Sequence, residues 1–578
     1  EFRRVLFRSR MKDSVRCALV CVCVAALVCV GECIARPQAT SAVQQKLEQR
    51  VLAALEAGSQ RGPAVKWYWD NWGSGGPTCV DYRNLTIVDL PKDTESIRQN
   101  LVTLQNAMEN AAAQYKNQLG LALGITYNGK MLFFGSAGST EKGNMLRPTL
   151  DTVVSVGSIT KVFTSLMMTA LADEGVLQVT DPVTKYFNEQ DQPAFSPKNP
   201  YDEKRGASAV TLESLATHTS GLPRESPCLY TSQCDKEAVR MVSSFPLFHQ
   251  PLTRPHYSNI GYTILGRSCE RAVQKHSGTQ TTYEEWLVKN AMLPFNMTSS
   301  GFDYPYDIRR RMAAGYMMMA DGSLQQLYPT SLFFNNPCGG MYSTTRDMLS
   351  FAARLMENSG TVLSHNAYEQ YLMPGLDMPD GVSSFGRAGW EVAYANGFRT
   401  ITKGGLIGGF GSSIALIPEL RLGVFGWINM LTGVIPAKLT AAAMNLLVPT
   451  LLTELQKHQP KHEEPNVMDM IVGTYAWQGV KYIIVQRDAH TSSTGIYTGM
   501  FYNMPVRFEF DAKTTATFGQ GVPVYAFRYH AIPPEGLDSC FAVSSAGTDD
   551  GLIFFVIQGG YVTATAPDLA FGNVPKQA

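Results

Sequence analysis

A charged segment at residues 457–465 divides this chain of 578 residues into two stretches with different patterns, and this division constrains the fold more than any other feature. The charge and the prolines at 460 and 465 are typical of a linker. Helical and strand patterns mix before the linker, whereas short β-rich runs separated by Gly, Asp and Ser follow it over residues 466–578. A coiled coil or repeat architecture is therefore excluded, and the last stretch predicts an antiparallel β-domain or small barrel.

The stretch before the linker predicts both helices and strands. Asn128-Gly129 is the strongest short turn signal, and the apolar runs around it predict a hairpin over 121–135. From Ser158 onward, apolar residues recur at three-four spacing, which predicts a helix that ends near Gly175. Other patterns predict helices over 93–115 and 436–456, strands over 398–429, and a mainly helical, loop-rich stretch over 176–390.

The N-terminal region contains segments that are not expected to belong to the fold. Residues 1–10 precede the first methionine and are interpreted as a cloning or assembly remnant. Residues 11–35 combine a basic start, an apolar run and small residues near Ala35, which predicts a signal peptide and a secreted protein; an uncleaved membrane anchor is the alternative. Residues 36–92 form an N-terminal extension, whose aromatic cluster at 67–72 either packs on the main domain or binds carbohydrate.

Cysteines and sequons agree with a secretory route. Five of the 11 cysteines lie in the leader, and the remaining six permit disulfides. Cys228 and Cys234 are close enough in sequence to close one loop, whereas the other pairings stay open. Asn84 and Asn296 begin N-glycosylation sequons.

Composition and absent motifs narrow the function. Lys plus Arg and Asp plus Glu each number 49, so the bulk charge indicates no nucleic-acid partner, and a small-molecule or peptide substrate is expected. The sequence has no HExxH motif, and His458 and His462 lie in the linker without a third candidate ligand, so no metal and no cofactor are expected. A G-x-S-x-G elbow and a phosphate-binding loop are also absent. The oligomeric state stays open.

A serine and a lysine three residues apart can form a nucleophile and base without histidine, because both side chains leave a helix on one face. Three such pairs occur, Ser9/Lys12, Ser139/Lys142 and Ser158/Lys161, and only the last opens a predicted helix. The positive end of that helix favours charge that develops on an attacked carbonyl oxygen. The alternative interpretation is a capping serine beside a solvated lysine. As a lysine in a cleft, Lys161 is expected to add little to the core.

Two further segments supply possible partners. Tyr257-Ser258-Asn259 offers a phenol and an amide, although Tyr-x-Asn also occurs elsewhere in the chain. Lys403 ends a predicted strand, and Gly404 and Gly405 follow it without side chains, so that a substrate could lie against the strand edge. An ordinary lysine before a glycine-rich turn is the alternative.

The order of these three motifs resembles the penicillin-recognising serine hydrolases, of the class C β-lactamase and D-Ala carboxypeptidase type. The resemblance covers about residues 93–455. It is carried by the segments 154–161, 215–223, 257–262, 337–343, 403–405 and 408–410. It implies an α/β (α+β) fold in which a five-stranded antiparallel sheet is flanked by helices and lies beside an all-helical lobe, within a catalytic domain at 93–456 that precedes the linker and the C-terminal β-domain.

The resemblance also implies roles. Ser158 would be the acylated nucleophile, Lys161 and Tyr257 would share proton transfer, and Asn259 would hold Lys161 and the substrate amide. Lys403 would form the far wall with the substrate-binding residues Gly404, Gly405 and Leu406. The backbone N–H groups of Ser158 and Leu406 would form the oxyanion hole, and His218 would have a structural role in a turn.

One departure separates this chain from the pattern. The residue after the third-motif lysine usually carries a hydroxyl for a substrate carboxylate, whereas Gly404 has none. The sequence therefore predicts a serine hydrolase acting on an amide, peptide or ester through an acyl-enzyme, without specifying β-lactams or D-Ala peptides. A catalytically silent relative that binds a peptide, lipid or protein is the alternative.

Overall fold

The computed structural model describes residues 87–576, except 91–93, 189–193, 201–209, 229–233, 359, 378–383, 397, 458–467, 478–479, 488–495, 502–503, 515–523, 532–550, 559–560 and 567–570. The leader, the aromatic cluster, the sequon at Asn84 and the linker beyond residue 457 lie outside these residues. The chain divides into two compact units, consisting mainly of Asp89–Leu451 and Leu452–Ala578. The predicted domain bounds stay predictions.

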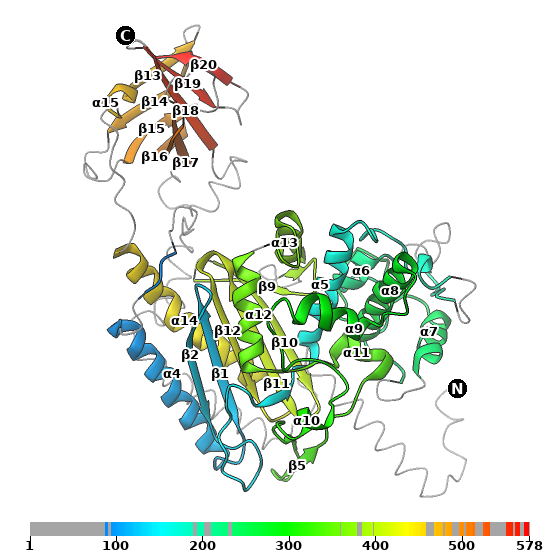
Figure 1. The fold of residues 1–578 in the computed structure, drawn as a ribbon. Coiled ribbons are helices and arrows are strands. Elements are labelled where there is room, and N and C mark those ends of the chain that lie inside the picture. Colours follow the sequence, from blue (N-terminus) through cyan, green and yellow to red (C-terminus); the bar gives the residue numbers. More distant parts are fainter. Residues whose placement is uncertain are drawn as a thin grey trace, which may run out of the picture. The chain divides into compact units, whose positions relative to one another are not determined.

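An antiparallel sheet forms the centre of the first unit, with strands in the order β2-β1-β12-β11-β10-β9-β8-β7 (Figure 1). Its strands are β1 (Leu121–Tyr127), β2 (Lys130–Ala137), β7 (Pro374–Asp377), β8 (Ser384–Gly386), β9 (Glu391–Ala395), β10 (Phe398–Ile407), β11 (Phe410–Ile417) and β12 (Leu422–Ile428). The antiparallel α+β fold is confirmed, but the sheet has eight strands where five were expected. The additional strands β7, β8 and β9 are three to five residues long, too short to show alternation in the sequence.

Local turn chemistry sets the register of the sheet. Asn128 and Gly129 both have positive φ and connect β1 to β2, which confirms the predicted hairpin. Gly408 and Gly409 make the corresponding turn between β10 and β11, again with positive φ at both positions. A side chain at Gly409 would lie 2.4 Å from the backbone of Tyr316, so the tip of this hairpin is fixed against a neighbouring strand.

Helices cover both faces of this sheet (Figure 1). On one face lie α4 (Glu95–Gln114) and α14 (Val434–Lys457), which confirm two predicted helices. Glycines on the strands mark these contacts: a Cβ at Gly426 would meet Leu439 of α14 at 3.4 Å, and one at Gly124 would meet Leu349 of α12 (Thr345–Glu357) at 2.8 Å. Because these two glycines lie on opposite faces of the strands, α12 covers the face away from α14.

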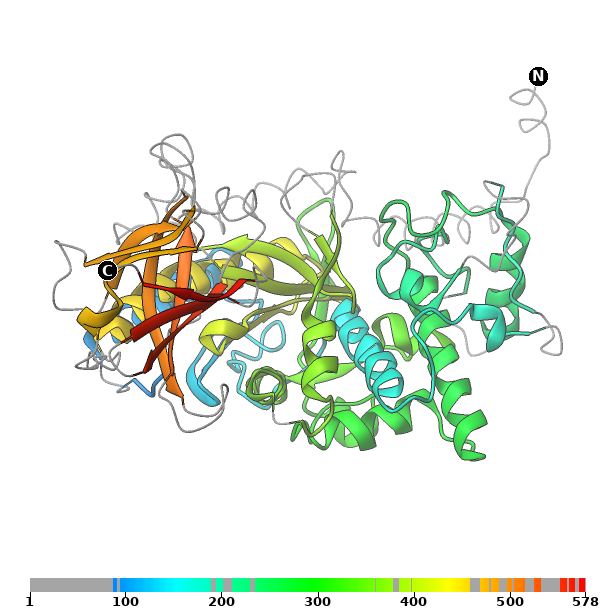
Figure 2. The ribbon, with the colours of Figure 1, turned by 90° about the horizontal axis from the view of Figure 1, so that it is seen from above.

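A mainly helical lobe lies beside the sheet (Figure 2, cyan to green). Its helices are α5 (Thr160–Asp173), α6 (Leu212–Ala216), α7 (Cys234–Ser244), α8 (Asn259–Ser277), α9 (Tyr283–Leu287), α10 (Tyr306–Arg309), α11 (Asn336–Gly339) and α13 (His365–Leu372). Short turns are η1 (Gly157–Ile159), η2 (Val183–Lys185), η4 (Val288–Met292), η5 (Phe333–Asn335) and η6 (Pro418–Leu420). Two small sheets pair β3 (Val153–Ser155) with β6 (Tyr342–Thr344), and β4 (Gly315–Met318) with β5 (Leu324–Leu327).

The second unit is an eight-stranded antiparallel sheet in chain order, preceded by α15 (Met468–Ile471). Its strands are β13 (Gly473–Trp477), β14 (Val480–Arg487), β15 (Ile496–Phe501), β16 (Met504–Thr514), β17 (Val524–Ala531), β18 (Gly551–Gln558), β19 (Tyr561–Ala566) and β20 (Phe571–Pro575). A bridge between Tyr475 and Lys576 joins the first strand to the residue after the last. The predicted antiparallel β-domain is confirmed, and the β-rich runs of the sequence at 482–485, 506–510, 524–529, 552–557 and 561–565 lie within β14, β16, β17, β18 and β19.

Among the described helices, α14 alone is long and apolar enough to cross a membrane. More than half of its apolar window, 56%, is buried inside the protein, and core helices of soluble proteins meet the same criterion.

Candidate active site

Ser158 lies in the tight turn η1, where β3 ends and α5 begins. The preceding residue, Gly157, has a φ of +54°. A Cβ at Gly157 would lie 2.7 Å from the backbone nitrogen of Leu406, which real side chains do not tolerate. Glycine therefore allows the turn to approach β10, and this approach brings Ser158 close to Leu406.

Lys161 lies in the first turn of α5, and its side chain is completely buried. Its Nζ donates hydrogen bonds to Ser158 Oγ at 3.1 Å, to Asn259 Oδ1 at 2.7 Å and to the carbonyl oxygen of Cys338 at 2.5 Å. The expectation that Lys161 adds little to the core is wrong, because packing between α5, α8 and α11 removes the side chain from water. Its three acceptors are neutral oxygens, so the burial of its ammonium is compensated by hydrogen bonds and not by an ion pair.

The second motif lies at the start of α8. Ser258 is the N-cap, and its hydroxyl accepts a hydrogen bond from the Gly261 backbone N–H at 2.9 Å. This cap places Asn259 in the first helical turn, where its Nδ2 donates to Glu225 Oε2 at 2.8 Å while its Oδ1 accepts from Lys161. One amide group thus connects the lysine to a carboxylate.

Tyr257 lies between two lysines. The Nζ atoms of Lys161 and Lys403 lie 4.9 Å and 5.2 Å from the centre of its ring. The residue is 4% exposed, and its hydroxyl is buried without a hydrogen-bond partner among the described residues. A buried hydroxyl of this kind is costly in a finished core. It is therefore available to a group that enters the site.

His218 supports Tyr257 from behind. The two rings stack with centroids 4.2 Å apart, and His218 Nδ1 accepts the Ser258 backbone N–H at 3.0 Å. Burial, reinforced by the charges of Lys161, Lys403 and Arg224, holds the pKa of His218 well below its ordinary value. The imidazole is therefore neutral, and its hydrogen bond fixes the backbone beside Tyr257.

Lys403 lies on β10 and is also completely buried, but its partner is a carboxylate. Its Nζ lies 2.6 Å from Glu391 Oε1, on β9. Strand β9 pairs with β10 only as far as Thr402, opposite Glu391. From Lys403 to Ile407, β10 pairs only with β11 among the described strands. The predicted substrate-binding residues Gly404, Gly405 and Leu406 lie within this stretch.

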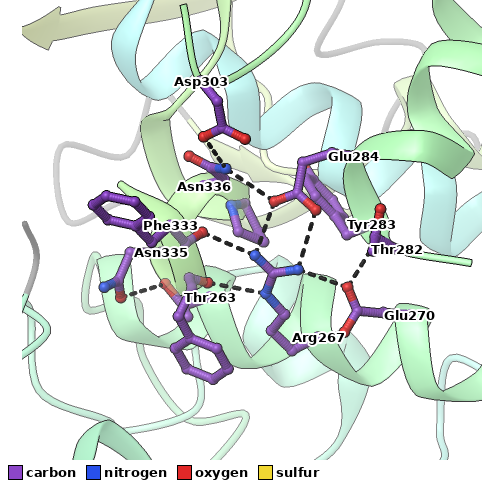
Figure 3. Close-up of polar contacts among 12 residues, drawn as sticks. Thr263, Arg267, Glu270, Thr282, Tyr283, Glu284, Asp303, Phe333, Asn335 and Asn336 are labelled. Carbon is purple, nitrogen blue, oxygen red and sulfur yellow. Dashed lines mark hydrogen bonds and ion pairs between the residues drawn. The ribbon is translucent and has the colours of Figure 1, made fainter. Parts of the chain in front are cut away.

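A partly buried polar cluster lies at the start of α11, the helix that carries Cys338 (Figure 3). At its centre, Arg267 pairs with Glu284 at 2.9 Å and Glu270 at 2.6 Å. Glu284 in turn accepts a hydrogen bond from Asn336 Nδ2 at 2.9 Å, at the start of α11. Since α11 carries Cys338, the cluster orients the Cys338 carbonyl oxygen toward Lys161. Burial raises the pKa of the Cys338 thiol, which stays protonated.

The structure thus brings the five residues predicted for catalysis into one place. They are Ser158, Lys161, Tyr257, Asn259 and Lys403. Sequence reasoning missed Glu391, Glu225 and the Cys338 carbonyl. Only Cys338 had a signal, since it lies in one of the segments that resemble the family. In the described part of the chain, no group of three or more potential metal ligands occurs.

The remaining predicted sites are only partly described. Asn296 is exposed and has a φ of +59°, in a turn after η4. Cys228 is disulfide-bonded, but the side chain of Cys234 lies outside the described residues, so the pairing of the two stays a prediction. Cys269 and Cys338 are buried free thiols.

The comparison with protein families agrees with this geometry. A family model described as Beta-lactamase matches residues 105–447, which is more than half of the chain. The chain belongs to the beta-lactamase family. The match contains all five residues predicted for catalysis.

Proteins similar to this chain come from several different organisms. Beta-lactamase-like protein 2 of Dictyostelium discoideum is 28% identical over 402 residues, which cover 66% of this chain and 70% of the relative. The human beta-lactamase-like 1 protein is 28% identical over 376 residues, covering 63% and 71%. The D-alanyl-D-alanine-carboxypeptidase/endopeptidase AmpH of Escherichia coli (strain K12) is 28% identical over 324 residues, covering 53% and 78%.

A solved structure supports the fold. The octameric penicillin-binding protein homologue from Pyrococcus abyssi aligns with a TM-score of 0.51 at 20% identity, covering 82% of this chain and 98% of the homologue. At this identity, the likeness concerns the fold alone.

Proposed function

We propose that this chain is a serine hydrolase that acts on an amide, peptide or ester through an acyl-enzyme on Ser158. The observation that carries the proposal is the position of the Lys161 amine, 3.1 Å from Ser158 Oγ and held there by Asn259 and the Cys338 carbonyl. A nucleophile within hydrogen-bond reach of a base that a third group orients is the arrangement that covalent catalysis requires.

The chemistry follows from these contacts. Ser158 Oγ attacks the acyl carbon as its proton passes to the neutral amine of Lys161, and the new C–O bond forms a tetrahedral oxyanion. The backbone N–H groups of Ser158 and Leu406 stabilise that charge. The bond to the leaving group then breaks, and the leaving group takes a proton through the Tyr257 hydroxyl. Water repeats the sequence on the acyl-enzyme, which releases a carboxylic acid and restores Ser158.

Two observations support this assignment of roles. The Tyr257 hydroxyl is buried and unpartnered among the described residues, which suits a group that exchanges a proton with the substrate. The relative AmpH is named as a D-alanyl-D-alanine-carboxypeptidase/endopeptidase, and this name supports amide hydrolysis as the proposed reaction.

Labelling with a fluorophosphonate probe tests the proposal. The probe is expected to modify the purified protein at Ser158, and Ser158→Ala is expected to abolish labelling. Ser139→Ala is a matched control, because Ser139 also precedes a lysine by three residues but its hydroxyl donates to Asn144 and not to that lysine. A folded wild-type protein that is neither labelled nor active on acyl esters, dipeptides and β-lactams would contradict the proposal.

A silent binding protein is the second candidate, and Gly404 favours it, because the residue after the lysine lacks the hydroxyl that the family pattern provides. Such a protein would bind an acyl ligand in this cleft without ever being labelled at Ser158.

We also propose entry into the secretory pathway, with membrane anchoring by an uncleaved leader as the alternative. The apolar leader at 11–35, the exposed Asn296 and the disulfide of Cys228 support it. Animal cells that express the chain should release it into the medium, and glycosidase treatment should lower its apparent mass on a gel. Asn84→Gln and Asn296→Gln should each remove one glycan. Retention of an unglycosylated product in the cytosol would contradict the proposal.

A further inference from the structure

The two buried lysines of the site carry different counter-charges. Lys161 is held by three neutral oxygens, whereas Lys403 lies 2.6 Å from the carboxylate of Glu391. The Lys403 side chain is completely buried, while that of Glu391 is 39% exposed. The charge that solvent or a ligand meets at this position is therefore the negative charge of Glu391.

Glu391 stands where a ligand would enter the open strand edge. It is the first residue of β9 and pairs with Thr402, the last residue of β10 that β9 covers. The next residue, Lys403, begins the stretch of β10 that pairs only with β11 among the described strands. A main chain laid along Gly404 and Gly405 would therefore begin beside the Glu391 carboxylate.

A second carboxylate, that of Glu225, lies beside Asn259. Glu225 binds the Asn259 amide at 2.8 Å and forms an ion pair with Arg224 at 3.0 Å. Its side chain is 31% exposed. Each partly exposed carboxylate thus neutralises a cation, which leaves Lys161 as the positive charge without a carboxylate partner among the described residues of the site. When Lys161 gives up its proton to act as a base, the site has no net positive charge with which to bind an anion.

The glycine at position 404 lacks the other group that could bind a substrate carboxylate. A substrate carboxylate would need either a hydroxyl at this position or an unpaired ammonium at Lys403. Gly404 has no side chain, and the Lys403 ammonium is engaged by Glu391.

From these observations we infer that the site accepts acyl substrates without a free carboxylate beside the scissile bond, such as internal peptide bonds, capped peptides or neutral esters, and that Glu391 is the residue that rejects the free acid. The inference rests on the proposed function for the identity of the scissile bond. Like charges at a desolvated contact repel strongly, which gives the rejection its physical basis.

A matched pair of ligands tests this selectivity. N-acetyl-Ala-Ala carries a free carboxylate, and its C-terminal amide differs only in that charge. Binding of both to the Ser158→Ala protein, measured by calorimetry, does not require catalysis. The amide is expected to bind about tenfold more tightly, and Glu391→Gln on the same background should bring the two affinities to within about threefold of one another.

Controls separate the possible outcomes. Glu237→Gln removes one carboxylate from the surface pair with Arg240 and should leave the preference unchanged. Glu391→Asp keeps the charge and should keep the preference. An unchanged preference in a folded Glu391→Gln protein, or tighter binding of the free acid to the parent, would overturn the inference; if Glu391→Gln fails to fold, the parent and Glu391→Asp proteins decide it. Wild-type protein that shows the preference but is never acylated would contradict the proposed function and leave the selectivity standing.

Discussion

Two buried lysines lie close to one tyrosine ring, and they differ in what holds them. Lys161 donates to a hydroxyl, an amide oxygen and a backbone carbonyl, all neutral. Lys403 pairs with the carboxylate of Glu391. A lysine held by neutral oxygens can release its proton without separating an ion pair, whereas one paired with a carboxylate cannot. The two lysines therefore suit different tasks in the proposed mechanism, Lys161 proton transfer and Lys403 a fixed charge.

The two lysines also differ in how their surroundings are built. Lys161 is within three residues of its nucleophile, so helix geometry alone brings the pair together. Lys403 meets Glu391 only because β9 folds back along β10, and both meet Tyr257 through contacts distant in sequence. The contact between Lys161 and Ser158 is thus determined by the local sequence, whereas the contact between Lys403 and Glu391 depends on the tertiary structure.

The largest expected difference between the two lysines is the effect of replacing each of them by methionine. Lys161→Met is expected to lower the rate of fluorophosphonate labelling by about 10²- to 10⁴-fold, the usual contribution of a general base. Lys403→Met should lower it by about tenfold or less, since it removes charge but no proton acceptor. Labelling reactions that are stopped at timed intervals and resolved on gels give both rates, and thermal unfolding shows whether each variant is folded. Equal losses in the two variants would contradict the division of roles.

Removing Arg267 tests the cluster that orients the Cys338 carbonyl. Arg267→Met leaves the partly buried Glu270 and Glu284 without their counter-charge, so we expect a loss of about 2–3 kcal/mol in the free energy of unfolding. Urea unfolding measures this loss. Arg240→Met, in an exposed pair on α7, should change the value by less than about 0.5 kcal/mol. Similar values for the two variants would mean that the cluster of Figure 3 does not stabilise the lobe.

The Gly157→Ala variant tests the close approach of η1 to β10. The variant places a Cβ at positive φ against the Leu406 nitrogen, so we expect a loss of stability of about 1–3 kcal/mol. Labelling should slow by about 10²-fold as the oxyanion donors separate. Gly175→Ala is the control: it has a φ of +72° but no atom within 4 Å of the new Cβ, so it should lose stability without losing labelling. Undiminished labelling of Gly157→Ala would refute a role for Leu406 in the oxyanion hole.

The smallest expected effect is the change of stability with pH. Because the pKa of His218 lies well below its ordinary value of 6.5 in the folded state, the unfolded chain binds more protons in mildly acidic solution. Stability contributed by this histidine is therefore complete above pH 6.5 and falls below it, by up to about 1.4 kcal/mol per pH unit. His218→Phe should keep the ring stack and flatten the slope between pH 6.5 and 5 in urea unfolding. The exposed His276→Phe should not change the slope, and an equally steep slope in His218→Phe would rule the explanation out.

Local signals in the sequence predicted a good part of this molecule. The hairpin at Asn128-Gly129, the helix after Ser158 and the strands over 398–429 follow from turn chemistry and periodicity, which act over a few residues. The strands β7 to β9 were missed, because three to five residues cannot display a period. Glu391 was missed for the same reason, since nothing near it in sequence marks it as the partner of a lysine on the next strand.

The stretch of β10 that pairs only with β11 among the described strands also has a consequence for solubility. Backbone groups that can bind an extended acyl chain can equally bind a strand from another molecule and begin aggregation. Here the open segment covers only residues 403–407 and contains two adjacent glycines, which disfavour a persistent strand partner. The opening is long enough to receive a short chain and too short to template the growth of a fibril.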